Sequence, residues 1–412
     1  MPMNTRTQLR RLRVTMFGLI FIGALRITGA VWAQAPAPTM EAPSPANSVH
    51  SPEVQADGHV TFRIYAPDAT TVLIQAEGTE ANPGATQADV SKAMKGTPMV
   101  KGDDGVWSAT AGPFQPGVYG YNFLVDGVPT TDPRNPFATE ALTRVQSLYE
   151  VPGARFMEYR MDVPHGAIAA VWYPSSVTGS LRRMHVYTPP GYTGKQKLPV
   201  LYLFHGAGGS DDDWATKGRA GAILDNLIAE KKAVPMIVVM TAGHVSRDFQ
   251  MSRGPAALLN DSFADDVVKV VIPYVDQHYA TLADREHRAI AGFSMGGFQT
   301  MTIAFDHPEL FDYVGIFSSG WFPEWRNSNG PALKELGSYK AYGKPFKLVW
   351  VDAGKLDIAL ANSNASVELM RSYGIAPEVY ESEGFHFFNN WRDYLHTFAQ
   401  RLFQENAVAN AK

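Results

Sequence analysis

From about residue 165 onward, short continuous apolar runs alternate with segments of helical length. Continuous apolar runs are typical of strands that are buried on both faces of a parallel sheet. Apolar residues at three- and four-residue spacing predict helices between and after these runs. The alternation indicates βαβ units and therefore an α/β fold. The predicted strands are 200–204, 236–240, 288–291, 313–317 and 347–351, and the predicted helices are 261–278, 363–373 and 391–403.

The segment before residue 150 has a different pattern, in which short β-type runs alternate with turn signals. Glycines and the pair Asp126-Gly127 separate the runs at places where hairpins need a positive φ. This pattern predicts an all-β sandwich over 56–152, followed by the α/β domain over 153–412. The predicted strands are 59–65, 71–74, 106–109, 118–125 and 145–149.

The N-terminus has the pattern of a secretory signal peptide over 1–35: arginines, an apolar run over 14–25 and the small-residue site Ala33-Gln34-Ala35. A retained membrane anchor is the alternative, but the run is shorter than the ~20 residues of a spanning helix. Cleavage predicts a secreted or periplasmic protein without stable membrane association. Residues 36–55 are rich in proline and read as a linker.

Composition limits the classes of function. The chain has 412 residues, of which 45% are hydrophobic, a formal net charge of -4 and no cysteine. This length fits two domains, and neither of them depends on disulfides for stability. No basic cluster follows the N-terminus, so a nucleic-acid partner is not expected. A neutral or sugar-like substrate fits better.

The sharpest motif is Gly292-Phe293-Ser294-Met295-Gly296-Gly297, between a predicted strand and a predicted helix. A strand, a sharp turn and a helix are what a nucleophile elbow requires, with small residues that let the turn close. Ser294 is therefore the predicted nucleophile. The Met295 N–H and the helix N-terminus are expected to stabilise an oxyanion.

A second oxyanion donor is expected from the loop over 204–209, Phe-His-Gly-Ala-Gly-Gly, which follows an earlier strand. Glycine lets the main chain approach a substrate, and the Ala207 N–H is the predicted donor. The alternative is that the loop is only a flexible turn. Folds with a nucleophile elbow of this kind order their catalytic triad along the chain as serine, acid and histidine. His205 precedes Ser294, so it is predicted to be structural.

The same order selects the general base among the histidines after Ser294. His386 lies in a loop between a predicted strand at 378–380 and the last helix, where an imidazole can reach the nucleophile. His307 precedes a proline near a helix end and His396 lies within a helix, so both are predicted to serve packing or the surface.

Two aspartates are candidates for the acid. Asp352 ends the strand over 347–351, and Asp357 follows on the next loop. Asp357 also fits as the N-cap of a following helix, which alone would explain an aspartate there. Asp357 is favoured because the acid of this fold usually lies on the loop beyond the strand, and Asp352 stays open as the alternative.

The catalytic part resembles carbohydrate esterase family one and the wider esterase group of feruloyl, acetylxylan and enterochelin esterases. The resemblance rests on Leu203 to Ser210 with Trp214, Ile272 to Val275 with Tyr279, Asp284 to Gly297, and Gly384 to His386 with Trp391. It implies an α/β-hydrolase fold and an acyl-enzyme mechanism without metal or cofactor. The family's glycine-x-x-aspartate turn matches Gly354 to Asp357 and supports Asp357 as the acid. Phe385 stands where the family often has glycine or histidine, so the rim of the pocket is expected to differ.

The segment before it resembles the immunoglobulin-like domains that precede many glycoside-active enzymes, some of which are starch-binding modules. The resemblance rests on 60–67, 117–121 and 132–136. It suggests a sugar-stacking role for Trp107 or Tyr121, but aromatics on alternating strands are more often core residues. The expected role of the domain is to cover or complete the catalytic cleft.

The resemblance implies a small-molecule or polysaccharide ester as substrate, most simply a feruloyl or acetyl ester of plant cell-wall polysaccharide. A siderophore esterase of the enterochelin type is the alternative, and a sugar-binding protein with an inactive hydrolase domain is an alternative of another class. Asp211, Asp212 and Asp213 suggest either a cation site or, more simply, a solvated acidic loop. Trp214, Trp321, Phe322 and Trp325 are candidates for the flat walls that an aromatic acyl group would need. Core positions are an equally good interpretation for some of them, Trp214 most of all.

Overall fold

The computed structural model describes residues 44–245 and 262–404. Residues from Pro45 onward form one compact unit. The predicted signal peptide, 1–35, and residues 36–43 of the predicted linker lie outside the described residues. Within the described ranges, no helix has both the length and the apolar character that crossing a membrane requires.

The predicted linker is wrong over its second half. Residues 45–54 include a short helix, α1 (Pro45–Ser48), and a strand, β1 (Glu53–Val54). Strand β1 pairs antiparallel with β2 (Val60–Tyr65), and Val49 is buried. The first domain therefore begins before residue 56, because β1 extends the edge of its first sheet.

Two antiparallel sheets make up the first domain, with strand orders β1-β2-β6-β5 and β4-β3-β7-β10-β9. All five predicted strands are present, as β2, β3, β6, β7 and β10. Their inward side chains, among them Phe62, Tyr121 and Tyr149, form one hydrophobic core. A helix that the pattern did not predict, α2 (Gln87–Lys95), begins with a capping box of Thr86 and Asp89. The other strands are β3 (Val72–Ala76), β4 (Thr97–Pro98), β5 (Val100–Lys101), β6 (Val106–Ala111), β7 (Gly117–Val125), β8 (Val128–Thr130), which pairs with β7, β9 (Ala138–Glu140) and β10 (Val145–Val151).

The second domain is built on an eight-stranded sheet of order β11-β12-β14-β13-β15-β16-β17-β18. Its strands from β14 to β18 are parallel, and β11 and β12 pair antiparallel at one edge. The predicted strands are confirmed, whereas β11 and β12 were missed. The bounds are β11 (Ala167–Ser175), β12 (Ser180–Thr188), β13 (Val200–Phe204), β14 (Ile237–Thr241), β15 (Arg288–Phe293), β16 (Tyr313–Phe317), β17 (Leu348–Gly354) and β18 (Glu378–Ser382).

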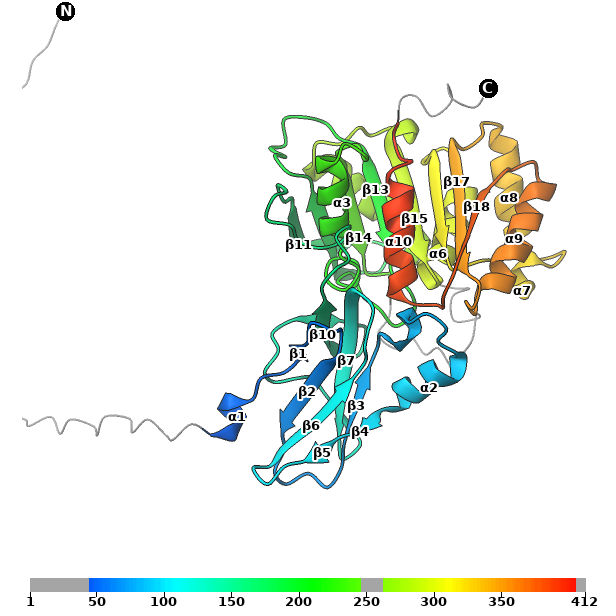
Figure 1. The fold of residues 1–412 in the computed structure, drawn as a ribbon. Coiled ribbons are helices and arrows are strands. Elements are labelled where there is room, and N and C mark those ends of the chain that lie inside the picture. Colours follow the sequence, from blue (N-terminus) through cyan, green and yellow to red (C-terminus); the bar gives the residue numbers. More distant parts are fainter. Residues whose placement is uncertain (1–43, 246–261, 405–412) are drawn as a thin grey trace, which may run out of the picture. The chain divides into compact units, whose positions relative to one another are not determined.

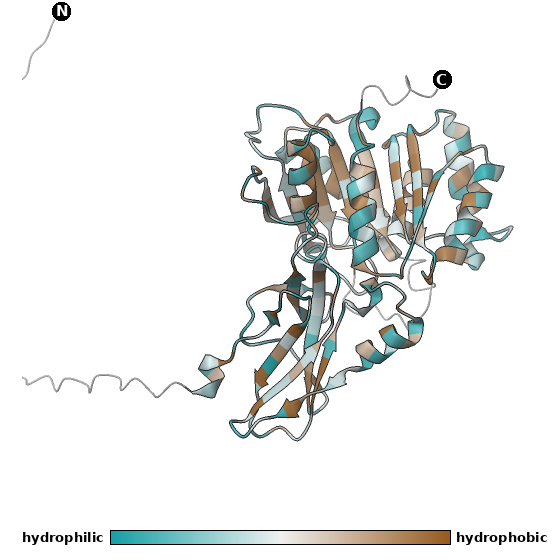
Figure 2. Ribbon diagram, in the orientation of Figure 1, coloured by the Kyte–Doolittle hydropathy of each residue, from teal (hydrophilic) through white to brown (hydrophobic). Residues whose placement is uncertain are grey.

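Helices cover both faces of this sheet, as its apolar strands require (Figure 1). On one face, α3 (Ala220–Ala229) and α10 (Phe388–Ala399) pack on side chains such as Leu201 and Leu203. On the other, α6 (Met295–Asp306), α8 (Pro331–Tyr342) and α9 (Leu360–Ser372) pack on Tyr202 and Phe204. Figure 2 shows hydrophobic residues concentrated on the central strands. The predicted helix over 261–278 is present as α4 (Phe263–Asp266), a π-helical turn and α5 (Ile272–His278), which pack on the same face as α6.

Buried charged groups join the two domains. Arg392 of α10 is fully buried and donates hydrogen bonds to the carbonyl oxygens of Val118 and Lys217, each at 2.9 Å. Lys217 in turn lies 2.6 Å from the carboxylate of Glu77 in the first domain. Burial lowers the pKa of the Arg392 guanidinium to about 10. Removing one partner from such buried contacts leaves an uncompensated charge, which strongly favours the joined arrangement.

Candidate active site

Ser294 lies at a sharp turn between β15 and α6. Its backbone has φ 53° and ψ -117°, an unusual conformation for a residue with a side chain. A Cβ at Gly292 would lie 2.6 Å from the backbone of Gly296, and a Cβ at Gly296 would lie 2.6 Å from the carbonyl oxygen of His205. A Cβ at Gly297 would lie 2.5 Å from Ser319 Cβ. The glycines of the motif are therefore required for the turn to close.

The main chain of Ser294 is fixed on both sides. Its N–H donates to the carbonyl oxygen of Phe317 at the end of β16, at 2.9 Å, and its carbonyl oxygen accepts from the Ser319 hydroxyl at 2.6 Å. The side chain is half-buried, and α6 begins at the next residue, Met295. The N-terminus of a twelve-residue helix thus lies beside the hydroxyl and favours negative charge there.

His386 and Asp357 form a hydrogen bond of 2.8 Å between Nδ1 and Oδ1. The Asp357 side chain is fully buried, whereas that of His386 is 19% exposed. Burial raises the pKa of the Asp357 carboxyl, but bonds from His386, Ser318 and the Ala359 N–H outweigh burial and leave this pKa lowered. Asp357 is therefore held as a carboxylate that orients the imidazole. Nδ1 of His386 faces Asp357, which leaves Nε2 of His386 for proton transfer.

Asp352 has a different environment. It is buried at the end of β17, and its Oδ2 accepts from Trp350 Nε1 at 2.6 Å. Burial raises the pKa of this carboxyl well above its usual value. Of the two predicted acids, the structure brings Asp357 to His386, and Asp352 faces a tryptophan instead. The expected N-cap role is not realised, since α9 begins at Leu360, but Asp357 does accept the Ala359 N–H at 2.7 Å.

Residues 205–210, the oxyanion loop, follow β13 and pass close over the nucleophile. A Cβ at Gly206 would lie 3.3 Å from Ser294 Cβ and 2.4 Å from the ring of Phe293. Only glycine lets the main chain come this near. The loop therefore lies close to Ser294. Ala207, the predicted oxyanion donor, lines the same cavity as His386.

We expect Gly206→Ala to lower the free energy of unfolding by about 1–3 kcal/mol through overpacking and to reduce kcat/KM at least tenfold. The new methyl group must displace the oxyanion loop or the Phe293 ring. Urea denaturation and ester hydrolysis measure the two effects. Gly337→Ala in α8 is the matched control, because nothing lies within 4 Å of its Cβ position. An equal response of both variants would contradict the close approach.

His205 is structural, as its place in the chain predicts. It is 1% exposed, and burial lowers its pKa to about 4, so the ring is neutral near pH 7. Its Nδ1 lies 2.7 Å from the carbonyl oxygen of Gly206, and its Nε2 accepts the Gly243 N–H at 2.7 Å. Both ring nitrogens are occupied by main-chain groups and neither serves Ser294.

A cavity of about 410 Å³ opens beside the oxyanion loop and His386. Trp391 forms part of its wall. The Trp391 ring packs edge-on against the His386 ring, with the ring centroids 5.0 Å apart, and stacks on the Phe293 ring, with the ring centroids 3.8 Å apart. The first domain contributes part of the lining. Sequence reasoning missed most of these residues, although Trp391 belongs to the motif around His386. The lining comprises Gly206 to Gly209, Phe293, His386, Phe387, Phe388 and Trp391, with Asp213 and Lys217, and Glu77, Met94, Thr139, Ala141, Thr143, Arg144 and Gln146 from the first domain.

The predicted aromatic walls are largely wrong. Trp214 is 1% exposed and donates to the Phe204 carbonyl oxygen, and Trp321 is fully buried with its Nε1 bonded to Glu335. Trp325 is also buried, against Phe298. Of the four, Phe322 alone is partly exposed. These tryptophans fill the core, because large aromatic side chains contribute most through burial. The same holds for Trp107 and Tyr121 of the first domain, which are buried as the packing interpretation predicted.

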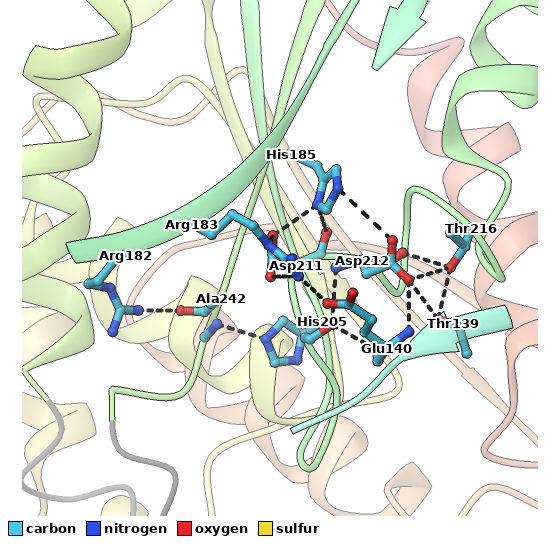
Figure 3. A network of polar contacts seen from close by, with 12 residues as sticks. Thr139, Glu140, Arg182, Arg183, His185, His205, Asp211, Asp212, Thr216 and Ala242 are labelled. Carbon is cyan, nitrogen blue, oxygen red and sulfur yellow. Dashed lines mark hydrogen bonds and ion pairs between the residues drawn. The ribbon is translucent and has the colours of Figure 1, made fainter. Parts of the chain in front are cut away.

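Asp211, Asp212 and Asp213 are not a solvated acidic loop, since all three are buried. Asp211 bonds to Arg183 at 2.7 Å and lies 2.8 Å from His185, while Asp212 accepts the Glu140 N–H at 2.8 Å (Figure 3). Burial raises the pKa of Asp213 to about 7. Asp211 thus links the segment that follows the oxyanion loop to β12, and Asp212 links it to β9. The described residues contain no group of acidic, histidine or cysteine side chains arranged to hold a metal ion.

The chain is similar to known esterases. An endo-1,4-beta-xylanase/feruloyl esterase of Xylanibacter ruminicola is 35% identical over 365 residues, which cover 86% of this chain and 46% of the relative. The chain spans less than half the length of the first curated relatives it matches. A ferulic acid esterase structure from Anaeromyces mucronatus matches with a TM-score of 0.55 and 25% identity, over 61% of this chain and 96% of that one.

The enterobactin esterase of Shigella flexneri shares the fold, with a TM-score of 0.59 and 19% identity over 87% of this chain and 97% of that one. The second domain is therefore an α/β-hydrolase-type esterase fold. The family model described as "Putative esterase" matches residues 175–404, more than half of the chain. The predicted resemblance of the second domain to the esterase group is confirmed, and the chain belongs to this esterase family.

Proposed function

We propose that the protein is a serine carboxylic-ester hydrolase with Ser294 as nucleophile, His386 as general base and Asp357 as the acid that orients it. The observation that carries this proposal is the 2.8 Å bond between His386 and Asp357, at the same edge of the sheet as a strained serine at a helix N-terminus. Asp357 and His386 come from segments that follow the neighbouring strands β17 and β18. The carboxyl ends of parallel strands are where such folds assemble their sites.

The reaction follows from these positions. His386 Nε2 removes the proton of Ser294 as the serine oxygen attacks the ester carbonyl. The Ala207 and Met295 N–H groups stabilise the oxyanion, and Asp357 stabilises the imidazolium. The alcohol leaves with the proton from His386, and water repeats the sequence on the acyl-enzyme. Every step uses groups that this chain supplies.

For the substrate, we infer a feruloyl or acetyl ester of plant cell-wall polysaccharide. The aromatic side of the cavity, with Phe387, Phe388 and Trp391, suits a flat acyl group. The alignment with the xylanase/feruloyl esterase is longer than the second domain and so extends into the first. The first domain, which we propose to be immunoglobulin-like, contributes mostly polar residues to the lining of the cavity and would meet the sugar side of such an ester.

A siderophore ester of the enterochelin type is the second candidate. The enterobactin esterase structure covers 87% of this chain, which exceeds the second domain alone, but at 19% identity it supports the fold only. An anionic catecholate would favour a basic cavity. Here Lys217 is paired with Glu77, and the lining holds both Arg144 and Asp213, so basic and acidic groups are balanced, which favours a neutral substrate.

Hydrolysis of methyl ferulate, acetylated xylan and enterochelin by the purified protein, measured side by side, tests the proposal. We expect methyl ferulate or acetylated xylan to be hydrolysed and enterochelin to be a poor substrate. Hydrolysis of enterochelin alone would select the siderophore reaction. Activity on none of the three, together with binding of xylan fragments, would leave the third candidate, a sugar-binding protein with an inactive hydrolase domain.

We further propose export, because residues 1–35 have the sequence pattern of a cleaved signal peptide. Secretion would bring the enzyme to a polymer that cannot enter the cell. N-terminal sequencing of the protein from the medium or periplasm is expected to start after Ala35, and an intact N-terminus in the membrane fraction would indicate a retained anchor instead.

A further inference from the structure

Two imidazole rings join the oxyanion loop to residues 242–244, which follow β14. His205 of the loop accepts the Gly243 N–H through Nε2 at 2.7 Å, and His244 accepts the Gly208 N–H through Nε2 at 2.8 Å. The ring centroids lie 5.5 Å apart. Each segment therefore supplies one ring nitrogen to a main-chain N–H of the other, and His244 had no signal in the sequence.

Both rings are neutral in this arrangement. A ring nitrogen that accepts an N–H carries no proton, so in each ring the proton is assigned to Nδ1. In His205 this Nδ1–H donates to the Gly206 carbonyl oxygen at 2.7 Å. Burial lowers the pKa of His205 to about 4 and that of His244 to about 3, and the charge of Arg182 acts in the same direction. Near pH 7 both rings therefore remain hydrogen-bond acceptors at Nε2.

These bonds fix the two peptide planes on either side of Ala207. The Gly206 carbonyl and the Ala207 N–H belong to one planar trans peptide and point in opposite directions. Because His205 holds the carbonyl, the direction of the Ala207 N–H is set. The next peptide ends in the Gly208 N–H, which His244 holds. The Ala207 amide cannot turn without breaking one of these bonds.

The acceptor segment is itself fixed to the nucleophile helix and to the sheet. Gln299 of α6 donates to the Gly243 carbonyl oxygen at 2.9 Å. Arg182 of β12 donates to the carbonyl oxygens of Ala242 and His244 (Figure 3, for Ala242). From the first domain, the Leu142 N–H donates to the Gly208 carbonyl oxygen at 3.0 Å. His244 therefore acts on a loop whose other contacts are already set relative to Ser294.

We propose that His244 is a positioning residue of the esterase reaction, which holds the Ala207 amide in the direction that stabilises the oxyanion. The inference rests on the proposed function, because it concerns the transition state of ester hydrolysis. The Ala207 amide stabilises the reaction only when negative charge develops on the carbonyl oxygen of the substrate, so holding this amide in place matters in the transition state. Loss of His244 is therefore expected to affect kcat and to leave substrate binding nearly unchanged.

The test compares His244→Ala with His244→Gln, whose amide oxygen can still accept the Gly208 N–H. We expect His244→Ala to lower kcat on methyl ferulate about 10- to 100-fold, less than the roughly 10²- to 10³-fold of losing a donor outright, with KM within about twofold. His244→Gln is expected to recover a large part of this loss. His307→Ala, at a half-buried histidine near a helix end, is the matched control and is expected to keep full activity.

Binding measurements separate positioning from a general loss of structure. Phenylboronic acid forms a tetrahedral adduct with the serine and requires the oxyanion donors, whereas the product ferulate does not. We expect His244→Ala to weaken phenylboronic acid binding in proportion to kcat/KM and to leave ferulate binding unchanged. Equal weakening of both ligands, or an active His244→Ala variant, would overturn the positioning role. Equal activity of the wild type and Ser294→Ala would instead overturn the proposed function, whatever His244 does.

The wild-type protein offers a test that needs no variant. In ¹⁵N-resolved NMR spectra at pH 7, His244 is expected to be neutral, with its proton on Nδ1 and an unprotonated Nε2. A proton on Nε2 would exclude the bond from Gly208 and overturn the proposal even if the variants failed to fold.

Discussion

Ser294→Ala is expected to lower kcat on methyl ferulate about 10⁶-fold while the protein stays folded. The loss is this large because the serine oxygen forms the covalent intermediate, and members of such a triad act as a unit. The residual rate over water, roughly 10³- to 10⁴-fold, reflects the oxyanion donors and substrate binding, which the variant retains. Ester hydrolysis with purified protein and thermal unfolding measure the two properties.

A fluorophosphonate probe supplies the direct control. Intact mass spectrometry is expected to find one adduct on the wild type, at the peptide with Ser294, and none on Ser294→Ala. Ser372→Ala, at an exposed serine of α9, is expected to react like the wild type. Labelling of Ser294→Ala, or equal hydrolysis by wild type and variant, would remove the serine from its proposed role.

Sequence patterns predicted those parts of the fold that depend on local signals. Strands buried on both faces give continuous apolar runs, and all five strands that were predicted from such runs are present in the large sheet. The elbow was predictable because its glycines form a recognisable sequence motif, and Gly292 is required by a contact with Gly296 inside the turn itself. Strand β11 was missed because it is an edge strand with mostly exposed residues, which leaves no buried run in the sequence. Helix α2 was missed because it has few apolar residues and buries only Val90, which leaves a weak helical pattern in the sequence.

Candidate site residues can be named from the sequence where chain order restricts the choice, and they are missed where only tertiary contacts decide. Ser294 and His386 follow from motif and order. Trp214 and Trp321 were assigned to the pocket because composition does not distinguish a wall from a core, and both are buried. His244 had no motif, since its role comes from a bond to a residue 36 positions away. The wall from the first domain likewise depends on packing between domains.

The second large effect is expected for Asp357→Asn, which should lower kcat about 10⁴-fold with little change in KM or in the melting temperature. The carboxylate accepts the Nδ1–H of His386 at 2.8 Å and so leaves Nε2 free to take the serine proton. A carboxamide of the same shape can present its NH₂ group to Nδ1. The imidazole would then carry its proton on Nε2 and could not act as a base.

Asp352→Asn is the matched control, because Asp352 and Asp357 were both candidates for the acid from the sequence and both are buried. Burial raises the pKa of Asp352 well above its usual value and so favours the uncharged carboxyl, which a carboxamide resembles in polarity. Its bond from Trp350 Nε1 can be kept by the asparagine oxygen. We therefore expect kcat within about threefold of the wild type. A larger loss in Asp352→Asn than in Asp357→Asn would reverse the assignment of the acid, and equal losses would indicate that neither carboxylate orients His386 alone.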